Sequence, residues 1–110
     1  MKRDINLFIQ DILENIKDIE IFSKGLNKEK FENDKLKQNA IIRSLEIIGE
    51  ATKNIPDSFR DKYSNIPWRK ISGFRDVLSH AYFGVSMERI WNIIEKDLPE
   101  LRKEIEKIKF

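Results

Sequence analysis

The sequence contains no cysteine, which excludes a disulfide framework and a zinc–thiolate site. No stretch approaches the roughly 18 consecutive apolar residues that a membrane-spanning helix needs. The first residues, Met-Lys-Arg-Asp-Ile-Asn, lack the uncharged apolar run of a signal peptide. These absences predict a soluble cytoplasmic protein that does not associate with a membrane.

The chain also lacks an excess of either charge, because the formal net charge is only +2 although 36% of the residues are charged. Bulk charge therefore does not indicate a nucleic-acid binder, and interspersed charges of both signs are typical of a solvated helical surface. A chain of 110 residues is expected to form one domain, residues 1–110. Chains this short bury a small core and often complete it by dimerising.

Apolar residues recur at spacings of three and four, which is the pattern of one apolar helix face. This spacing predicts helices over residues 4–24, 35–54, 67–82 and from Ser86 onward. A polar connection at 26–34 and a loop at 55–66, in which residues 59–63 suggest a helical turn, join them. No segment reads as a strand. The predicted fold is an all-α, up-and-down bundle of four or five helices that dimerises.

Glycine and proline mark the expected helix boundaries. Gly25 is placed to end the first helix, and Pro67 to open the third at its first turn. Ser86 is a candidate N-cap for the last helix. Pro99 is expected either to kink that helix or to open a short separate one with Asp97 as its cap.

The single histidine, His80, lies in an unusual neighbourhood. An imidazole is well suited to proton transfer near neutral pH. Residues 67–75 carry Arg69, Lys70 and Arg75 with no acid among them, so they form a local basic patch on an otherwise balanced chain. We take Arg69 and Lys70 as candidate RNA-binding residues.

A helix through this segment would place its polar residues around one groove. Asp76 and His80 lie four residues apart and would face each other, so the carboxylate could orient the ring. Arg75 would lie about 140° around the helix from His80, where its planar guanidinium suits a phosphate. Ser79 and Tyr82 flank His80 as supporting hydroxyl groups.

Such residues are sufficient for RNA cleavage without a metal or another cofactor. The ribose 2′-OH attacks the adjacent phosphate, His80 transfers the proton, and Arg75 stabilises the charge that builds on the phosphate oxygens. This chemistry is restricted to RNA, because DNA lacks the 2′-OH.

Structural roles compete with this interpretation. A lone histidine at a helix end is more often structural than catalytic, and an isolated arginine is most often a surface charge. Trp68 and Trp91 are expected in a core or an interface rather than as base-stacking platforms. Glu46 and Glu50 have the spacing of a metal pair, but without a second carboxylate–histidine motif a solvated or interface role is favoured.

The segment Arg75-x4-His80-x-Tyr82 resembles the R-x4-H-x-Y signature of HepT-like HEPN proteins. Three further segments resemble segments of the family, and they occur along the chain in the same order as in the family. They are Leu45-Glu46-Ile47-Ile48-Gly49-Glu50-Ala51, Trp68-x2-Ile71-x-Gly73-x-Arg75, and Ile90-Trp91-x2-Ile94-x2-Asp97-Leu98-Pro99. Asp76 is a departure, because many relatives carry asparagine directly after the motif arginine. The departure adds a negative charge beside the expected RNA phosphate.

The resemblance implies a helical ribonuclease toxin that dimerises so that two motifs, each with Arg75 and His80, face one cleft. It also implies a minimal nucleotidyltransferase antitoxin that transfers AMP to Tyr82, and an mRNA or tRNA substrate. Two alternatives stay open at this point. The chain could be a non-catalytic subunit that binds a nucleotide or RNA beside a nucleotidyltransferase, or a purely structural dimer.

Overall fold

The computed structural model describes residues 4–79 and 87–109, and every regular element in these ranges is helical. The predicted all-α class is therefore confirmed. The elements are α1 (Ile5–Ser23), α2 (Lys28–Glu32), α3 (Lys35–Lys53), α4 (Asp57–Lys62), α5 (Trp68–Ser72), α6 (Phe74–Ser79), α7 (Met87–Asn92), the π-helix η2 (Ile93–Asp97) and α8 (Leu98–Ile105). Among the described residues, no helix has the length and apolar content needed to cross a bilayer.

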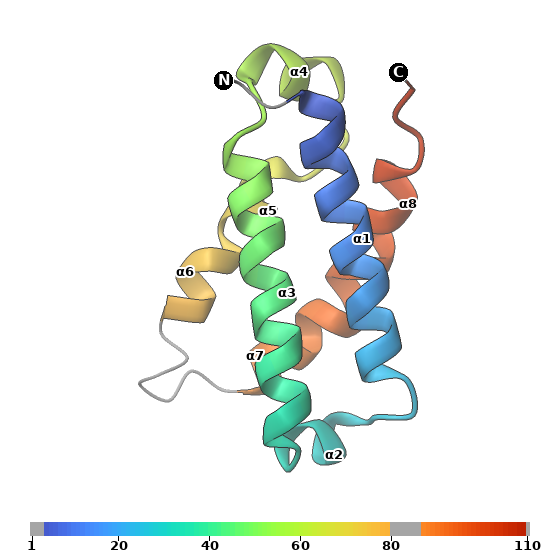
Figure 1. Cartoon of the computed structure of the whole chain (residues 1–110), viewed down its shortest axis with the longest axis vertical. Coiled ribbons are helices and arrows are strands. Elements are labelled where there is room, and N and C mark those ends of the chain that lie inside the picture. The colour runs from blue at the N-terminus through green and yellow to red at the C-terminus, as the bar shows by residue number, and fades with distance from the viewer. Residues whose placement is uncertain (1–3, 80–86, 110) are drawn as a thin grey trace.

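The antiparallel pair of α1 and α3 forms the frame of the bundle (Figure 1). The carboxylate of Asp4 accepts a hydrogen bond from the Asn6 amide and caps α1, and Gly25 follows the helix with a φ of +79°. This left-handed conformation favours glycine, and it ends the helix where the sequence predicted. Both long helices lie within one residue of their predicted bounds because each carries a continuous apolar stripe.

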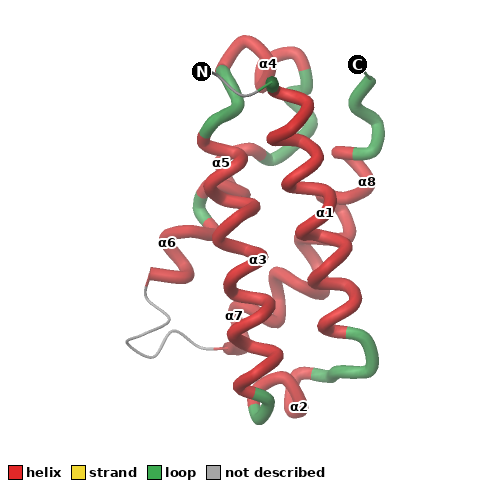
Figure 2. Tube along the Cα trace, in the orientation of Figure 1, coloured by secondary structure: helices red, strands yellow, loops and turns green. Residues whose placement is uncertain are grey.

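The remaining helices cover this pair and close the core. The segments α7, η2 and α8 run along the bundle behind α1 and α3, and α5 and α6 pack against α3 (Figure 2). Fully buried side chains from α1, α2, α3, α5, α7 and α8 fill the interior: Ile12, Ile16, Ile19, Phe31, Ile41, Leu45, Ile48, Ile71, Ile90, Leu98, Leu101 and Ile105. Burial of so many branched side chains supplies the main driving force for folding.

The connection at 26–34 is more ordered than the sequence predicted, because it contains the short helix α2. Asn27 caps this helix by accepting a hydrogen bond from the Lys30 amide at 2.8 Å. Phe31 is fully buried, with its ring centroid 5.5 Å from that of Trp91 on α7. Lys28 and Glu88 form an ion pair at 3.0 Å that also joins α2 to α7, and Glu88 raises the pKa of Lys28. Tertiary contacts thus stabilise a helix too short to be stable alone.

The prediction of one helix over 67–82 is wrong in its continuity. The structure divides the segment at Gly73 into α5 and α6, and residues 80–86 lie outside the described part of the chain, including the proposed Ser86 cap. Gly73 weakens a helix because its backbone has the most freedom to lose. Residues 55–66 contain α4 where the sequence suggested only a loop or a turn.

Pro99 affects the last helix through the turn that precedes it. The backbone widens into η2 over residues 93–97 and then continues into α8, with Asp97 in a helical conformation. A proline lacks an amide donor and crowds the carbonyl four residues before it, and a π-turn accommodates this defect. Asp97 stands at the N-cap position of α8, but its side chain makes no capping hydrogen bond. Of the two alternatives for Pro99, the helix capped by the Asp97 side chain is therefore wrong in its cap.

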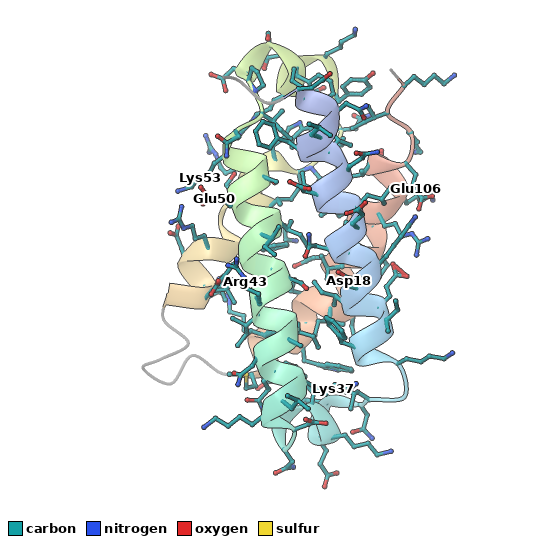
Figure 3. All side chains as sticks on the ribbon, in the orientation of Figure 1. Asp18, Lys37, Arg43, Glu50, Lys53 and Glu106 are labelled. Carbon is teal, nitrogen blue, oxygen red and sulfur yellow. The ribbon has the colours of Figure 1, made fainter. Side chains whose placement is uncertain are left out.

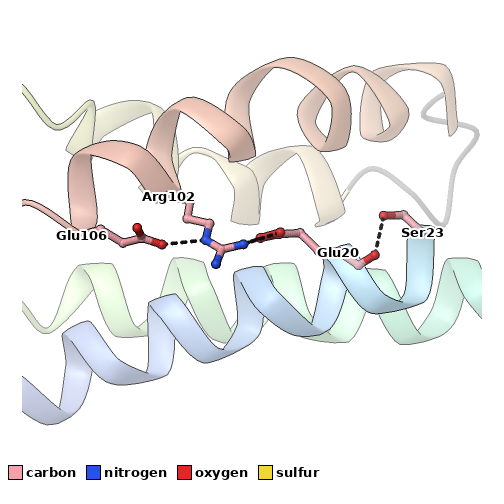
Figure 4. Close-up of polar contacts among 4 residues, drawn as sticks. All are labelled: Glu20, Ser23, Arg102 and Glu106. Atoms are coloured by element: carbon pink, nitrogen blue, oxygen red, sulfur yellow. Dashed lines mark hydrogen bonds and ion pairs between the residues drawn. The ribbon is translucent and has the colours of Figure 1, made fainter.

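Ion pairs join α8 to α1 on the outside of the bundle. Arg102 of α8 lies between Glu106, the C-cap residue of α8, and Glu20 of α1 (Figure 4). The Nε atom of Arg102 is 2.6 Å from Glu106 Oε1. Glu106 and Glu20 raise the pKa of the Arg102 guanidinium. Because this cluster is on the surface, it contributes modestly to stability but fixes how α8 lies on α1.

Candidate active site

Arg75 lies in the first turn of α6, directly after the break at Gly73. The amide of Gly73 donates to the Arg69 carbonyl at 3.0 Å, and its own carbonyl accepts from the Asp76 and Val77 amides. A Cβ at position 73 would lie 3.2 Å from the Lys70 carbonyl oxygen, so a larger residue would be tight there. The break lets α6 bury Val77 and Leu78 while the Arg75 side chain stays about half exposed.

The backbone of α6 approaches α3 closely at Gly49. A Cβ built on Gly49 would lie 3.6 Å from the Arg75 Cβ and 3.8 Å from the Arg75 amide nitrogen. These are ordinary contacts for a methyl group, but a longer side chain would have to displace α6. The start of the R-x4-H-x-Y segment thus packs directly on α3 at Gly49.

The guanidinium of Arg75 forms an ion pair with Glu50, one residue further along α3. The distance from Arg75 Nη1 to Glu50 Oε2 is 2.9 Å. A second pair, Arg43 with Glu46 at 3.2 Å, lies within α3. Figure 3 labels Arg43 and Glu50 along this helix. Glu46 and Glu50 thus each contact an arginine, which agrees with the predicted solvated or interface role.

An open hollow of about 680 Å³ surrounds these ion pairs between α1, α3 and α6. Its lining combines apolar side chains with charges of both signs: Phe8, Asp11, Arg43, Glu46, Ile47, Glu50, Ala51, Asn54, Arg75 and Leu78. Three carboxylates and two guanidinium groups belong to this lining, so the hollow is not a simple basic groove. Arg75 is the residue of the predicted signature that the described structure places in it.

Arg69 and Lys70 do not share this hollow. Both line a separate hollow of about 590 Å³ next to Pro67 and Trp68. Lys70 Nζ is 2.8 Å from Asp97 Oδ1, and this carboxylate raises the pKa of Lys70. The predicted basic patch is therefore divided over two faces, and an acid from another helix pairs with Lys70. Their proposed role in RNA binding stays a prediction.

The other predicted site residues are described only in part. Asp76 is exposed on α6, in the first turn beside Arg75. His80 and Tyr82 lie outside the described residues, as does the side chain of Ser79, so their convergence with Arg75 stays a prediction.

The two tryptophans belong to the core, which is one of the two locations, core or interface, that the sequence predicted. Trp68 donates its indole hydrogen toward the carbonyls of Arg60 and Tyr63, and Trp91 donates to Glu95 Oε1 at 2.6 Å. Each is buried, with its polar atom satisfied. They are structural anchors of the segments before and after the motif.

The sequence does not reveal the partner of Glu50. Spacing along the chain relates Glu50 only to Glu46, as a metal pair or as a solvated or interface acid. Its contact with Arg75 depends on how α6 packs on α3, which spacing along one helix does not reveal. The small Gly49 beside it was the available signal, since glycine in a helix often marks a close approach.

Comparison with known proteins agrees with the resemblance noted in the sequence. The family model described as "Ribonuclease HepT-like" matches residues 12–108. The chain is 43% identical over 105 residues to "Putative RNase MJ1380" of Methanocaldococcus jannaschii, with 96% of each chain covered. It is 45% identical over 109 residues to "Probable ribonuclease HepT" of Thermococcus cleftensis, with 99% of each covered. No solved structure matches the chain significantly.

The family description names a ribonuclease, which is the enzyme class predicted from the sequence. The match extends over nearly the whole chain, and the similar proteins are of nearly the same length. The chain therefore belongs to the ribonuclease HepT-like family, and the predicted family is confirmed.

Proposed function

We propose that this protein is a metal-independent endoribonuclease in which Arg75 and His80 carry the chemistry. Membership of the ribonuclease HepT-like family is the observation on which the proposal rests. The exposed guanidinium of Arg75, presented in an open hollow, supports it. An arginine is suited to a phosphate because it keeps its charge and can donate two parallel hydrogen bonds.

The proposed reaction needs only proton transfer and charge stabilisation. The 2′-oxygen of the ribose forms a bond to the adjacent phosphorus, and the bond from phosphorus to the 5′-oxygen breaks. His80 takes the proton from the 2′-OH and gives a proton to the departing 5′-oxygen, and Arg75 stabilises the negative charge on the phosphate between these steps. We assign no step to Asp76, Ser79 or Tyr82 beyond support of His80.

We further propose that two copies of the chain form the working enzyme. One copy supplies a single Arg75 to a broad, open hollow whose lining includes the half-buried apolar residues Phe8 and Ile47. A second copy across this face would cover apolar surface and bring a second Arg75–His80 set to one cleft. Homodimers commonly use the same patch on both subunits.

The activity is tested by comparing the wild-type chain with His80→Ala. We expect the wild type, expressed alone, to slow growth and fragment cellular RNA, and we expect His80→Ala to relieve both effects because the proton-transfer group is lost. Growth curves and RNA integrity on a denaturing gel measure the result. Equal toxicity of the two proteins, or tight RNA binding by the wild type without cleavage over long incubation, would contradict the proposal and favour a binding role.

We also propose that the protein acts as a toxin whose antitoxin is a minimal nucleotidyltransferase. Transfer of AMP to Tyr82 would place a bulky, charged group two residues from His80 and would compete with RNA for Arg75. Incubation with the partner enzyme and ATP should raise the intact mass by one or more AMP units, and Tyr82→Phe should abolish the increase. A mass increase that persists in Tyr82→Phe would assign the modification to another residue, such as Tyr63.

A further inference from the structure

Glu50 contacts one end of the Arg75 guanidinium and leaves the opposite edge open. The contact uses Arg75 Nη1 and Glu50 Oε2 at 2.9 Å. Among the described residues this is the one side-chain partner of Arg75, and the contact does not use the edge formed by Nε and Nη2. A phosphate can take two parallel hydrogen bonds from this edge. The ion pair therefore orients the guanidinium without occupying the edge that would bind RNA.

The helix that carries Glu50 is the longer of the two. α3 has 19 residues and packs along α1, whereas α6 has six residues and follows a break in the helix. Gly49 brings the two backbones together, with its hypothetical Cβ 3.6 Å from the Arg75 Cβ. An arginine side chain that is 52% exposed has many rotamers, and the ion pair with Glu50 favours those that keep the guanidinium beside α3.

We infer that Glu50 is a positioning residue for Arg75 in RNA cleavage, an inference that rests on the proposed function. An acid beside a phosphate-binding arginine weakens attraction of RNA, so Glu50 is unfavourable for a surface that only binds RNA. It is favourable for a surface that must hold the guanidinium in one orientation while charge develops on the phosphate. Loss of Glu50 should therefore have two effects. It should lower kcat, because the guanidinium is less well oriented, and it should leave KM unchanged or reduce it, because a negative charge near the RNA is removed.

The experiment compares Glu50→Gln with the matched variant Glu46→Gln. Both substitutions remove one negative charge from the same helix and the same hollow, but Glu46 contacts Arg43 rather than Arg75. We expect kcat of Glu50→Gln on a labelled RNA to be about ten- to a hundredfold below that of Glu46→Gln, the range expected for a misplaced catalytic group. KM should not rise in either variant. Thermal unfolding should be alike in both, because each pair is on the surface.

A second measurement reports on Arg75 itself. The Nε–Hε resonance of Arg75 should shift in Glu50→Gln and stay in place in Glu46→Gln. Equal kcat in the two variants, or a lower KM for Glu50→Gln with kcat unchanged, would overturn the positioning role. If Arg75→Ala abolishes cleavage while Glu50→Gln does not lower it, only this inference is lost. If the wild type does not cleave RNA, the proposed function fails and the inference fails with it.

Discussion

Replacing Arg75 by alanine should lower kcat for RNA cleavage by about a hundred- to a thousandfold, the usual effect of removing one group that stabilises charge in the transition state. The reason is geometric as well as electrostatic. Arg75 is the one cation of the predicted signature that the described structure places in the hollow between α1, α3 and α6. Single-turnover cleavage of a labelled RNA measures the effect on the chemical step directly.

Two further variants separate the proposed role of Arg75 from loss of charge. Arg75→Lys keeps the charge but loses the planar fork, so it should recover only part of the activity. Arg102→Ala removes another partly exposed arginine that is also held by carboxylates, and should cleave like the wild type. Its helix, α8, lies on the opposite side of the bundle from α6 in Figure 1. An Arg75→Ala protein that is folded and as active as Arg102→Ala would remove Arg75 from the mechanism.

The long helices could be predicted from the sequence because their signal is local. Ile12 and Ile48 each lie at the centre of an apolar stripe that repeats over many turns, and both are fully buried. Gly25 ends the first stripe and has the positive φ that such an ending requires. Apolar periodicity and helix-end signals indicate the same bounds in these segments, so the predicted bounds of α1 and α3 lie close to the observed ones.

The short elements could not be predicted in the same way, because distant residues stabilise them. A single apolar residue, Phe31, does not give α2 a periodic pattern, and its burial depends on Trp91. The break at Gly73 separates two apolar turns that follow one periodic pattern in the sequence. Local spacing therefore joined α5 and α6 into one helix, although the packing of the core divides them.

The sequence could predict only those features of the candidate site that depend on residue types and on spacing within one helix. Arg75 is exposed, as a phosphate-binding residue requires, and an exposed charge is the usual state of an arginine. The acids that surround it come from other helices, as Glu50 does for Arg75 and Asp97 for Lys70. A stretch that is purely basic in sequence is therefore partly neutralised in the folded chain, which a linear count of charge does not detect.

Phe31→Ala should destabilise the fold by about 3–5 kcal/mol, the usual cost of truncating a buried phenylalanine. Its ring is fully buried, and it packs against Trp91 where α2 meets α7. A domain of this size is stable by only about 5–15 kcal/mol, so the variant should approach marginal stability. The expected decrease in Tm is about 10–20 °C, measured by circular dichroism and checked by urea unfolding.

Leu36→Ala is the matched control, because Leu36 lies at the start of α3, next in the chain after α2, but its residue is 78% exposed. Its free energy of unfolding should change by less than about 0.5 kcal/mol. Phe31→Leu should fall between the two, since it keeps most of the buried volume but loses the ring contact with Trp91. If Phe31→Ala unfolds like Leu36→Ala, α2 does not anchor the bundle, and the close packing of Phe31 on α7 contributes little to the fold.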